Sequence, residues 1–151
     1  MLAAIGLIIG VTIAIAPYLD GPVNRIAGGP FKQEATDFSA LEPKFLANQG
    51  VVELEVNLDT RPSVEVAVVV HDAKIYIPAT LRPEEKRWPK AILADPNVKL
   101  RSEGTVVNAV AHRVRDLKLH QKLSELGAQK YSQSYFVPEN TWFFELGPKL
   151  H

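Results

Sequence analysis

Residues 51–59 read VVELEVNLD, and from Val52 onward their side chains alternate between apolar and polar types. Successive side chains of a β-strand point to opposite faces, so this period of two predicts a strand with one face in a core and one toward water. Arg61 and Pro62 end the pattern. The apolar set is Val52, Leu54, Val56 and Leu58, and the polar set is Glu53, Glu55, Asn57 and Asp59.

Further short strands are predicted on both sides of this segment. A valine-rich stretch and the strand after it are joined by a turn at 71–73, which indicates a β-hairpin. A second hairpin turns at 102–104. Short strands would otherwise leave exposed edges, so we expect a mainly β fold, a closed or nearly closed barrel of about six antiparallel strands. The predicted strands are 52–59, 63–70, 74–77, 98–101, 105–115 and 142–146.

Small helices are expected between the hairpins. Pro83, followed by two glutamates, is typical of a helix start, and Pro89 is expected to begin a second short helix. A later helix is predicted to begin after the N-cap Asp116 and to end at Gly127. The alternation places one set of side chains in a single barrel core: Val52, Leu54, Val56, Val66, Val68, Ile75, Ile77, Val98, Leu100, Trp142 and Phe144.

Composition excludes several classes of function. Lysine plus arginine and aspartate plus glutamate number 17 each, so no net charge recruits nucleic acid. The chain has no cysteine, which removes disulfides, thiolate metal sites and a cysteine nucleophile. The four histidines are scattered and form no metal-binding motif, so no metal site is expected. Nor does the chain contain a G-x-S-x-G or P-loop motif.

Residues 1–19 carry no charged side chain. A membrane-spanning helix needs about 20 apolar residues, and this segment just meets that length. We therefore predict a single-pass transmembrane anchor whose orientation is left open. A signal peptide cleaved after Ala14-Ile15-Ala16 and a buried core helix are the alternatives. Residues 20–44, rich in Gly-Pro pairs, are predicted to be a linker, and 45–151 the barrel domain.

Basic residues cluster after the first hairpin. Arg82, Lys86, Arg87 and Lys90 lie close together, with Trp88 among them. The junction of a strand with a helix offers free backbone N–H groups as well as positive side chains, which suits an anionic phosphate. The alternative is an exposed charged helix in which neighbouring glutamates pair with these cations.

The run from Lys74 to Asp116 resembles the split β-barrel flavoproteins of the pyridoxamine-phosphate-oxidase and deazaflavin-dependent nitroreductase families. The shared pattern is a strand ending at Thr80, a basic segment, a short helix, the turn Ala94-Asp95-Pro96, and a V-x-L strand beginning at Val98. The resemblance covers roughly residues 51–146. It departs from both families in lacking an S-R-K triplet and in having Leu-Arg-Pro at 81–83 in place of a glycine-rich turn.

This resemblance implies an oxidoreductase that binds FMN or a deazaflavin coenzyme between the subunits of a homodimer. The predicted N-terminal anchor would tether it to a membrane. The cofactor would pass hydride or electrons to a small acceptor, and no catalytic side chain is identified. By position, Arg87 and Lys90 match the residues that hold the flavin phosphate in the oxidases, and Trp88 matches a tryptophan of the nitroreductases. The implied cofactor contacts are Thr80, Arg82, Lys86, Arg87, Trp88 and Lys90. A non-catalytic barrel of the same fold, binding a ligand or partner in the cell envelope, is the alternative.

Overall fold

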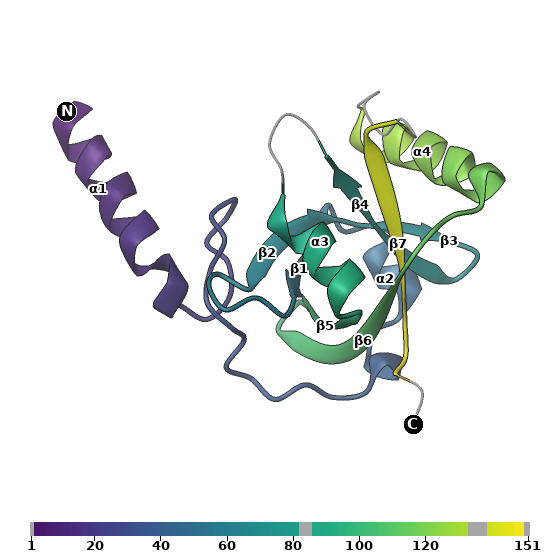
Figure 1. Cartoon of the computed structure of the whole chain (residues 1–151), viewed down its shortest axis with the longest axis horizontal. Helices are drawn as coiled ribbons and strands as arrows, with labels where there is room; N and C mark the ends of the chain where they lie inside the picture. Colours follow the sequence, from purple (N-terminus) through teal and green to yellow (C-terminus); the bar gives the residue numbers. More distant parts are fainter. Residues whose placement is uncertain (1, 82–85, 133–138, 150–151) are drawn as a thin grey trace.

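The computed structural model describes residues 2–81, 86–132 and 139–149 (Figure 1). Seven strands form one antiparallel sheet, with α3 and α4 packed on it and α1 standing apart from it. The elements are α1 (Leu2–Ile15), η1 (Ala16–Tyr18), η2 (Phe38–Ala40), α2 (Pro43–Leu46), β1 (Val51–Glu55), β2 (Ser63–Ala67), β3 (Val69–His71), β4 (Lys74–Thr80), α3 (Arg87–Ala94), β5 (Asn97–Ser102), β6 (Thr105–Arg113), α4 (Leu117–Tyr131) and β7 (Thr141–Gly147).

The valine-rich stretch 63–71 belongs to both edges of the sheet. The strand order is β2-β1-β5-β6-β7-β4-β3, so β2 and β3 lie at opposite ends although only Val68 separates them in sequence. Before Val68 the chain pairs with β1, and after it the chain pairs with β4. The sheet therefore curls into a split barrel that the chain itself bridges, without a continuous ring of paired strands.

The peptide groups of Val68 leave the strand ladder but keep hydrogen bonds. Its N–H donates to the hydroxyl of Tyr131 (2.9 Å), and its carbonyl accepts from the Lys130 ammonium (2.8 Å). The Tyr131 hydroxyl also lies 2.7 Å from the carbonyls of Val68 and Gly50, to one of which it donates. Burial raises the pKa of Tyr131, so the hydroxyl stays protonated at neutral pH. The end of α4 thus satisfies buried backbone groups that the split leaves unpaired.

The predicted barrel core is confirmed. Ten of the eleven predicted side chains belong to one buried cluster, and Trp142 packs against that cluster while only partly buried. Helix α3 adds Trp88, Ala91 and Ile92 to the same cluster, so it closes the interior of the barrel. On the opposite face of the sheet, α4 covers a second cluster made by Val69, Tyr76, Leu123 and Phe143.

The helices differ from the prediction in two places. A single helix, α3, runs from Arg87 through Pro89, because a proline in the first turn removes an N–H that has no partner within the helix. Helix α4 continues past Gly127, which is buried, and ends at Tyr131. The bonds that Lys130 and Tyr131 make to Val68 favour this last turn over termination at the glycine. The predicted helix start at Pro83 lies outside the described residues.

The predicted transmembrane helix over 1–19 is not supported. Helix α1 has 14 residues and gives way to a 3₁₀ turn at Ala16, because Pro17 disfavours helical geometry in the residue before it. Its length is about 21 Å at 1.5 Å per residue, against the roughly 30 Å of a bilayer core. Among the described residues, no helix combines the length and the apolar character that crossing a membrane requires. Membrane location stays a prediction.

Replacing Tyr131 with phenylalanine tests the role of the hydroxyl at the strand switch. We expect Tyr131→Phe to lower the free energy of unfolding by about 1–3 kcal/mol, because the buried N–H of Val68 loses its acceptor. Denaturant unfolding followed by circular dichroism measures the change. The matched control is Tyr18→Phe, since Tyr18 is 80% exposed, and it should leave stability unchanged. Equal stability of the two variants would contradict this role.

Candidate functional site

The start of α3 gathers the basic residues predicted as cofactor contacts. Lys86 is the N-cap residue and Arg87 the first residue of the helix, and none of the described side chains caps the backbone there. The side chain of Lys86 reaches back to the end of β4, where its ammonium donates to the Thr80 hydroxyl at 2.8 Å. The structure thus brings Thr80 and Lys86 together, two of the six predicted residues.

Burial around the Lys86 ammonium lowers its pKa below the ordinary value for lysine. The cause is the loss of hydration, which disfavours the charged form of the amine. An anion beside the ammonium would oppose this effect. Among the described residues the ammonium contacts a neutral hydroxyl, so the group retains positive charge that an incoming anion can use.

Arg87 connects α3 to the loop between β1 and β2. Its guanidinium donates to the Thr60 hydroxyl at 3.2 Å. In the part of the chain that the structure describes, neither Lys86 nor Arg87 forms an ion pair with a carboxylate. Each of these adjacent cations therefore contacts a hydroxyl group, Lys86 one on β4 and Arg87 one on the β1–β2 loop.

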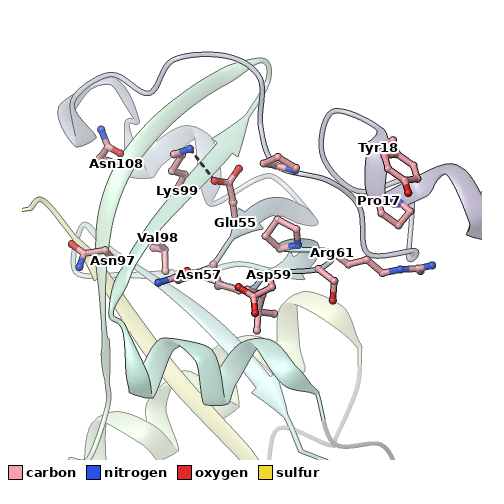
Figure 2. A pocket seen from close by; sticks show the side chains of 15 residues that line it. Pro17, Tyr18, Glu55, Asn57, Asp59, Arg61, Asn97, Val98, Lys99 and Asn108 are labelled. Carbon is pink, nitrogen blue, oxygen red and sulfur yellow. Dashed lines mark hydrogen bonds and ion pairs between the residues drawn. The ribbon is translucent and has the colours of Figure 1, made fainter.

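A cleft of about 780 Å³ opens on the side of that loop, where Figure 2 shows Asp59 and Arg61 among its lining residues. Thr60 also lines it. This volume is within the range of about 300–1,000 Å³ that small-molecule sites occupy. Two of its lining residues, Lys99 and Glu55, form an ion pair at 2.8 Å. The cleft is lined by Pro17, Tyr18, Pro30, Glu55, Val56, Asn57, Leu58, Asp59, Thr60, Arg61, Pro62, Asn97, Val98, Lys99 and Asn108.

The N-terminal wall of the cleft is fixed to the barrel. Gly28 donates to the carbonyl of Ser63 at 3.0 Å, and the buried Ser63 hydroxyl donates to the carbonyl of Gly29 at 2.6 Å. A Cβ at Gly28 would collide with the backbone of Gly21, so only glycine permits this approach. Since Gly29 also binds the carbonyl of Ala16 at 3.0 Å, the turn that carries Pro17 and Tyr18 is held in place.

The other predicted site residues lie elsewhere. Trp88 is buried in the barrel core, with its ring centroid 6.0 Å from that of Phe144. Lys90 is exposed on α3, and Arg82 lies outside the described residues. The assignment of these three residues as cofactor contacts stays a prediction.

The sequence reasoning missed the loop residues Thr60 and Arg61. Arg61 has a left-handed backbone (φ 52°), and its guanidinium donates to the carbonyl of Ile13 at 2.8 Å, near the end of α1. In the sequence, Arg61-Pro62 serves only as a signal that a strand ends. The contact between this loop and α3 joins residues that lie 27 positions apart, so no local pattern points to it.

Comparison with solved structures finds the same fold in proteins of low sequence identity. A candidate pyridoxamine 5'-phosphate oxidase from Listeria innocua matches with a TM-score of 0.54 at 14% identity, over 71% of this chain and 90% of that one. An FAD-binding protein from Mesorhizobium loti matches at 0.50 and 19%, over 71% and 86%. An F420-H2-dependent reductase, FDR-A, matches at 0.51 and 12%, over 66% and 95%.

These likenesses confirm the predicted resemblance at the level of the fold, which is the split β-barrel. No family model matches the sequence, and no curated protein matches it either. The fold is therefore shared with proteins named for pyridoxamine 5'-phosphate oxidation, FAD binding and F420-H2-dependent reduction, while the identities of 12–19% leave the function to be argued from the site.

The lowered pKa of Lys86 can be measured directly. We expect its side chain to titrate below the ordinary pH range of lysine when the ¹³Cε shifts of lysines are followed by NMR. Adding inorganic phosphate should raise the pKa of Lys86, because a nearby anion stabilises the ammonium. A Lys86 titration at the ordinary pKa of lysine, with and without phosphate, would show that the ammonium is fully hydrated.

Proposed function

We propose that the chain is a flavin- or deazaflavin-dependent oxidoreductase of the split β-barrel type. The observation that carries this proposal is the pair of cations, Lys86 and Arg87, which contact hydroxyl groups and no described carboxylate beside a cleft. The likeness of the fold to a candidate pyridoxamine 5'-phosphate oxidase, an FAD-binding protein and an F420-H2-dependent reductase supports it.

The residues at the start of α3 suit the phosphate end of such a cofactor. Phosphate oxygens accept several hydrogen bonds at once, and charge-assisted donors bind them most strongly. Lys86 supplies an ammonium, and Arg87 a planar guanidinium that can make two parallel contacts. The Thr80 and Thr60 hydroxyls, which now accept from these cations, can turn to donate to an oxyanion.

The ring system, when bound, supplies the hydride or electrons, so no side chain of this chain has to act as a nucleophile. The task of the protein is then to bind, to orient and to limit the access of water. The 780 Å³ cleft beside Thr60 offers enough room for a ring system or for the acceptor. We assign no catalytic residue.

We also propose a homodimer and a small-molecule acceptor. Both follow from the family resemblance rather than from contacts within the chain.

Cofactor retention tests the proposed activity. We expect full-length protein, produced in a host that makes both flavins and deazaflavins, to carry one of these molecules through purification. Native mass spectrometry identifies the bound molecule by mass and reads the number of subunits at the same time, and the absorbance spectrum distinguishes the two ring systems. Protein that is colourless and binds neither added FMN nor added deazaflavin would favour the non-catalytic barrel.

Substitution of Arg87 tests the phosphate contact. We expect Arg87→Ala to weaken cofactor affinity by about ten- to a hundredfold, the effect of losing one charge-assisted hydrogen bond. Arg87→Lys should recover only part of the loss, because lysine makes no bidentate contact. Fluorescence titration measures the affinities.

The control for this substitution is Lys122→Ala, which removes an exposed cation of α4 and should leave the affinity unchanged. Thermal unfolding of Arg87→Ala should match that of the parent protein, since exposed side chains contribute little to stability. If Arg87→Ala and Lys86→Ala both bind the cofactor with the parent affinity, the cations at the start of α3 are a solvated surface.

A further inference from the structure

A second group of cations lies where β6 runs into α4. Val114 donates to the carbonyl of Phe143 at 2.8 Å, so the pairing with β7 continues one residue beyond β6. The side chain of Val114 packs with the buried cluster beneath α4. Because side chains alternate along an extended strand, Arg113 and Arg115 project together to the opposite side. Both are exposed.

Arg113 is held in a defined position by an indole ring. The carbon at the centre of its guanidinium lies 4.0 Å from the centroid of Trp142, a cation–π contact. Trp142 is itself oriented by Phe144, which it meets edge-on at 6.4 Å between centroids. A guanidinium stacked on a ring keeps its N–H groups in its own plane, so they remain available at its edge.

The charge of this pair is not neutralised within the described residues. Neither Arg113 nor Arg115 forms an ion pair there, and the nearest carboxylate in sequence, Asp116, instead accepts from the backbone N–H of Leu119 at 2.9 Å. Burial, and after it the charge of Arg115, lower the pKa of Arg113. Arg101 is a contrasting case in the same barrel, since its guanidinium pairs with both Glu53 and Asp20.

A small pocket lies between these arginines and the first turn of α4. Its volume is about 210 Å³, and its walls are Arg113, Val114, Arg115, Leu117, His120, Thr141 and Trp142. The ring of His120 is fixed there by a bond from Nε2 to the carbonyl of Thr141 at 2.8 Å. The pocket is smaller than the roughly 300 Å³ at which drug-sized sites begin, so it suits a single charged group and not a whole nucleotide.

We propose that Arg113 and Arg115 bind a small oxyanion, a phosphate or a carboxylate group, in this pocket. Two guanidinium groups that share no carboxylate repel each other, and an oxyanion between them replaces that repulsion with charge-assisted hydrogen bonds. The site is separate from the cations at the start of α3. The pairing of Thr80 with Thr141 nevertheless brings both sites to the same end of β4 and β7.

NMR titration of the full chain with inorganic phosphate, and separately with acetate, tests this site at constant ionic strength. We expect saturable shifts of the Arg113 Nε–H and Trp142 Nε1–H signals with at least one ion. The ion with the higher affinity identifies the group. Arg113→Ala and Arg115→Ala should each weaken binding about tenfold or more, and Arg113→Lys should recover part of the loss. Lys122→Ala, a charge-matched control on α4, should bind as the parent does.

Three outcomes would overturn the proposal. Absence of a saturable shift with either ion excludes the site, provided that the amide spectrum is that of folded protein. An equal loss of affinity in Lys122→Ala would mean that the ion binds to positive surface charge in general. A Trp142 Nε1–H shift that survives Arg113→Ala but vanishes in Lys86→Ala places the ion at the start of α3. A failure of flavin binding, in contrast, leaves the result of this titration unaffected.

Discussion

The change of strand partner at Val68 is the constraint on which the architecture depends. The barrel can curl only because one valine-rich stretch pairs with β1 on one side of Val68 and with β4 on the other. The switch leaves a fully buried peptide without ladder partners, and an unsatisfied buried N–H or carbonyl costs about 1–3 kcal/mol. Lys130 and Tyr131, which lie 62 and 63 residues further along the chain, provide the missing hydrogen bonds and so remove that cost. Helix α4 therefore has to end beside Val68, which fixes its path across the sheet.

Because α4 covers one face of the sheet and the barrel core lies on the other, β4 and β7 are buried on both faces. Residues 75–79 of β4 are all buried, with Ile77 and Ala79 in the barrel core and Tyr76 in the cluster beneath α4. Six consecutive residue pairs join β4 to β7 and align Thr80 with Thr141. This pairing places the cations at the start of α3 and the arginines at the end of β6 at the same end of the sheet. Helix α3 starts a few residues after Thr80, and β6 leaves the sheet beside β7. The strand pair β4–β7, which is buried on both faces, thus positions the exposed basic side chains that lie near its Thr80–Thr141 end.

Much of the fold could be predicted from the sequence, because period-two alternation reports directly which face of a strand is buried. The resemblance predicts a split barrel, but the position of the split could not be predicted, since residues 66–70 form one apolar run that looks alike on both sides of Val68. The helix through Gly127 was missed for a related reason: the favourable contacts of Tyr131 are made with residues far away in sequence. The basic cluster that contains Lys86 and Arg87 could be predicted, because its lysines and arginines are neighbours in the sequence. Thr60, Arg61 and the Arg113–Trp142 contact depend on pairings between distant segments that no local pattern reveals.

The cations of this neutral chain differ in their partners. Lys99 pairs with Glu55, and Arg101 pairs with Glu53 and Asp20 and stacks on Phe31 at 4.4 Å, so Arg101 attaches the N-terminal segment to the barrel. Lys86, Arg87, Arg113 and Arg115 make no such pairs in the described part of the chain. Carboxylates are as numerous as cations, so composition alone does not explain this difference. Because unneutralised positive charge near β4 and β7 costs stability, retaining it is consistent with selection for binding anions there.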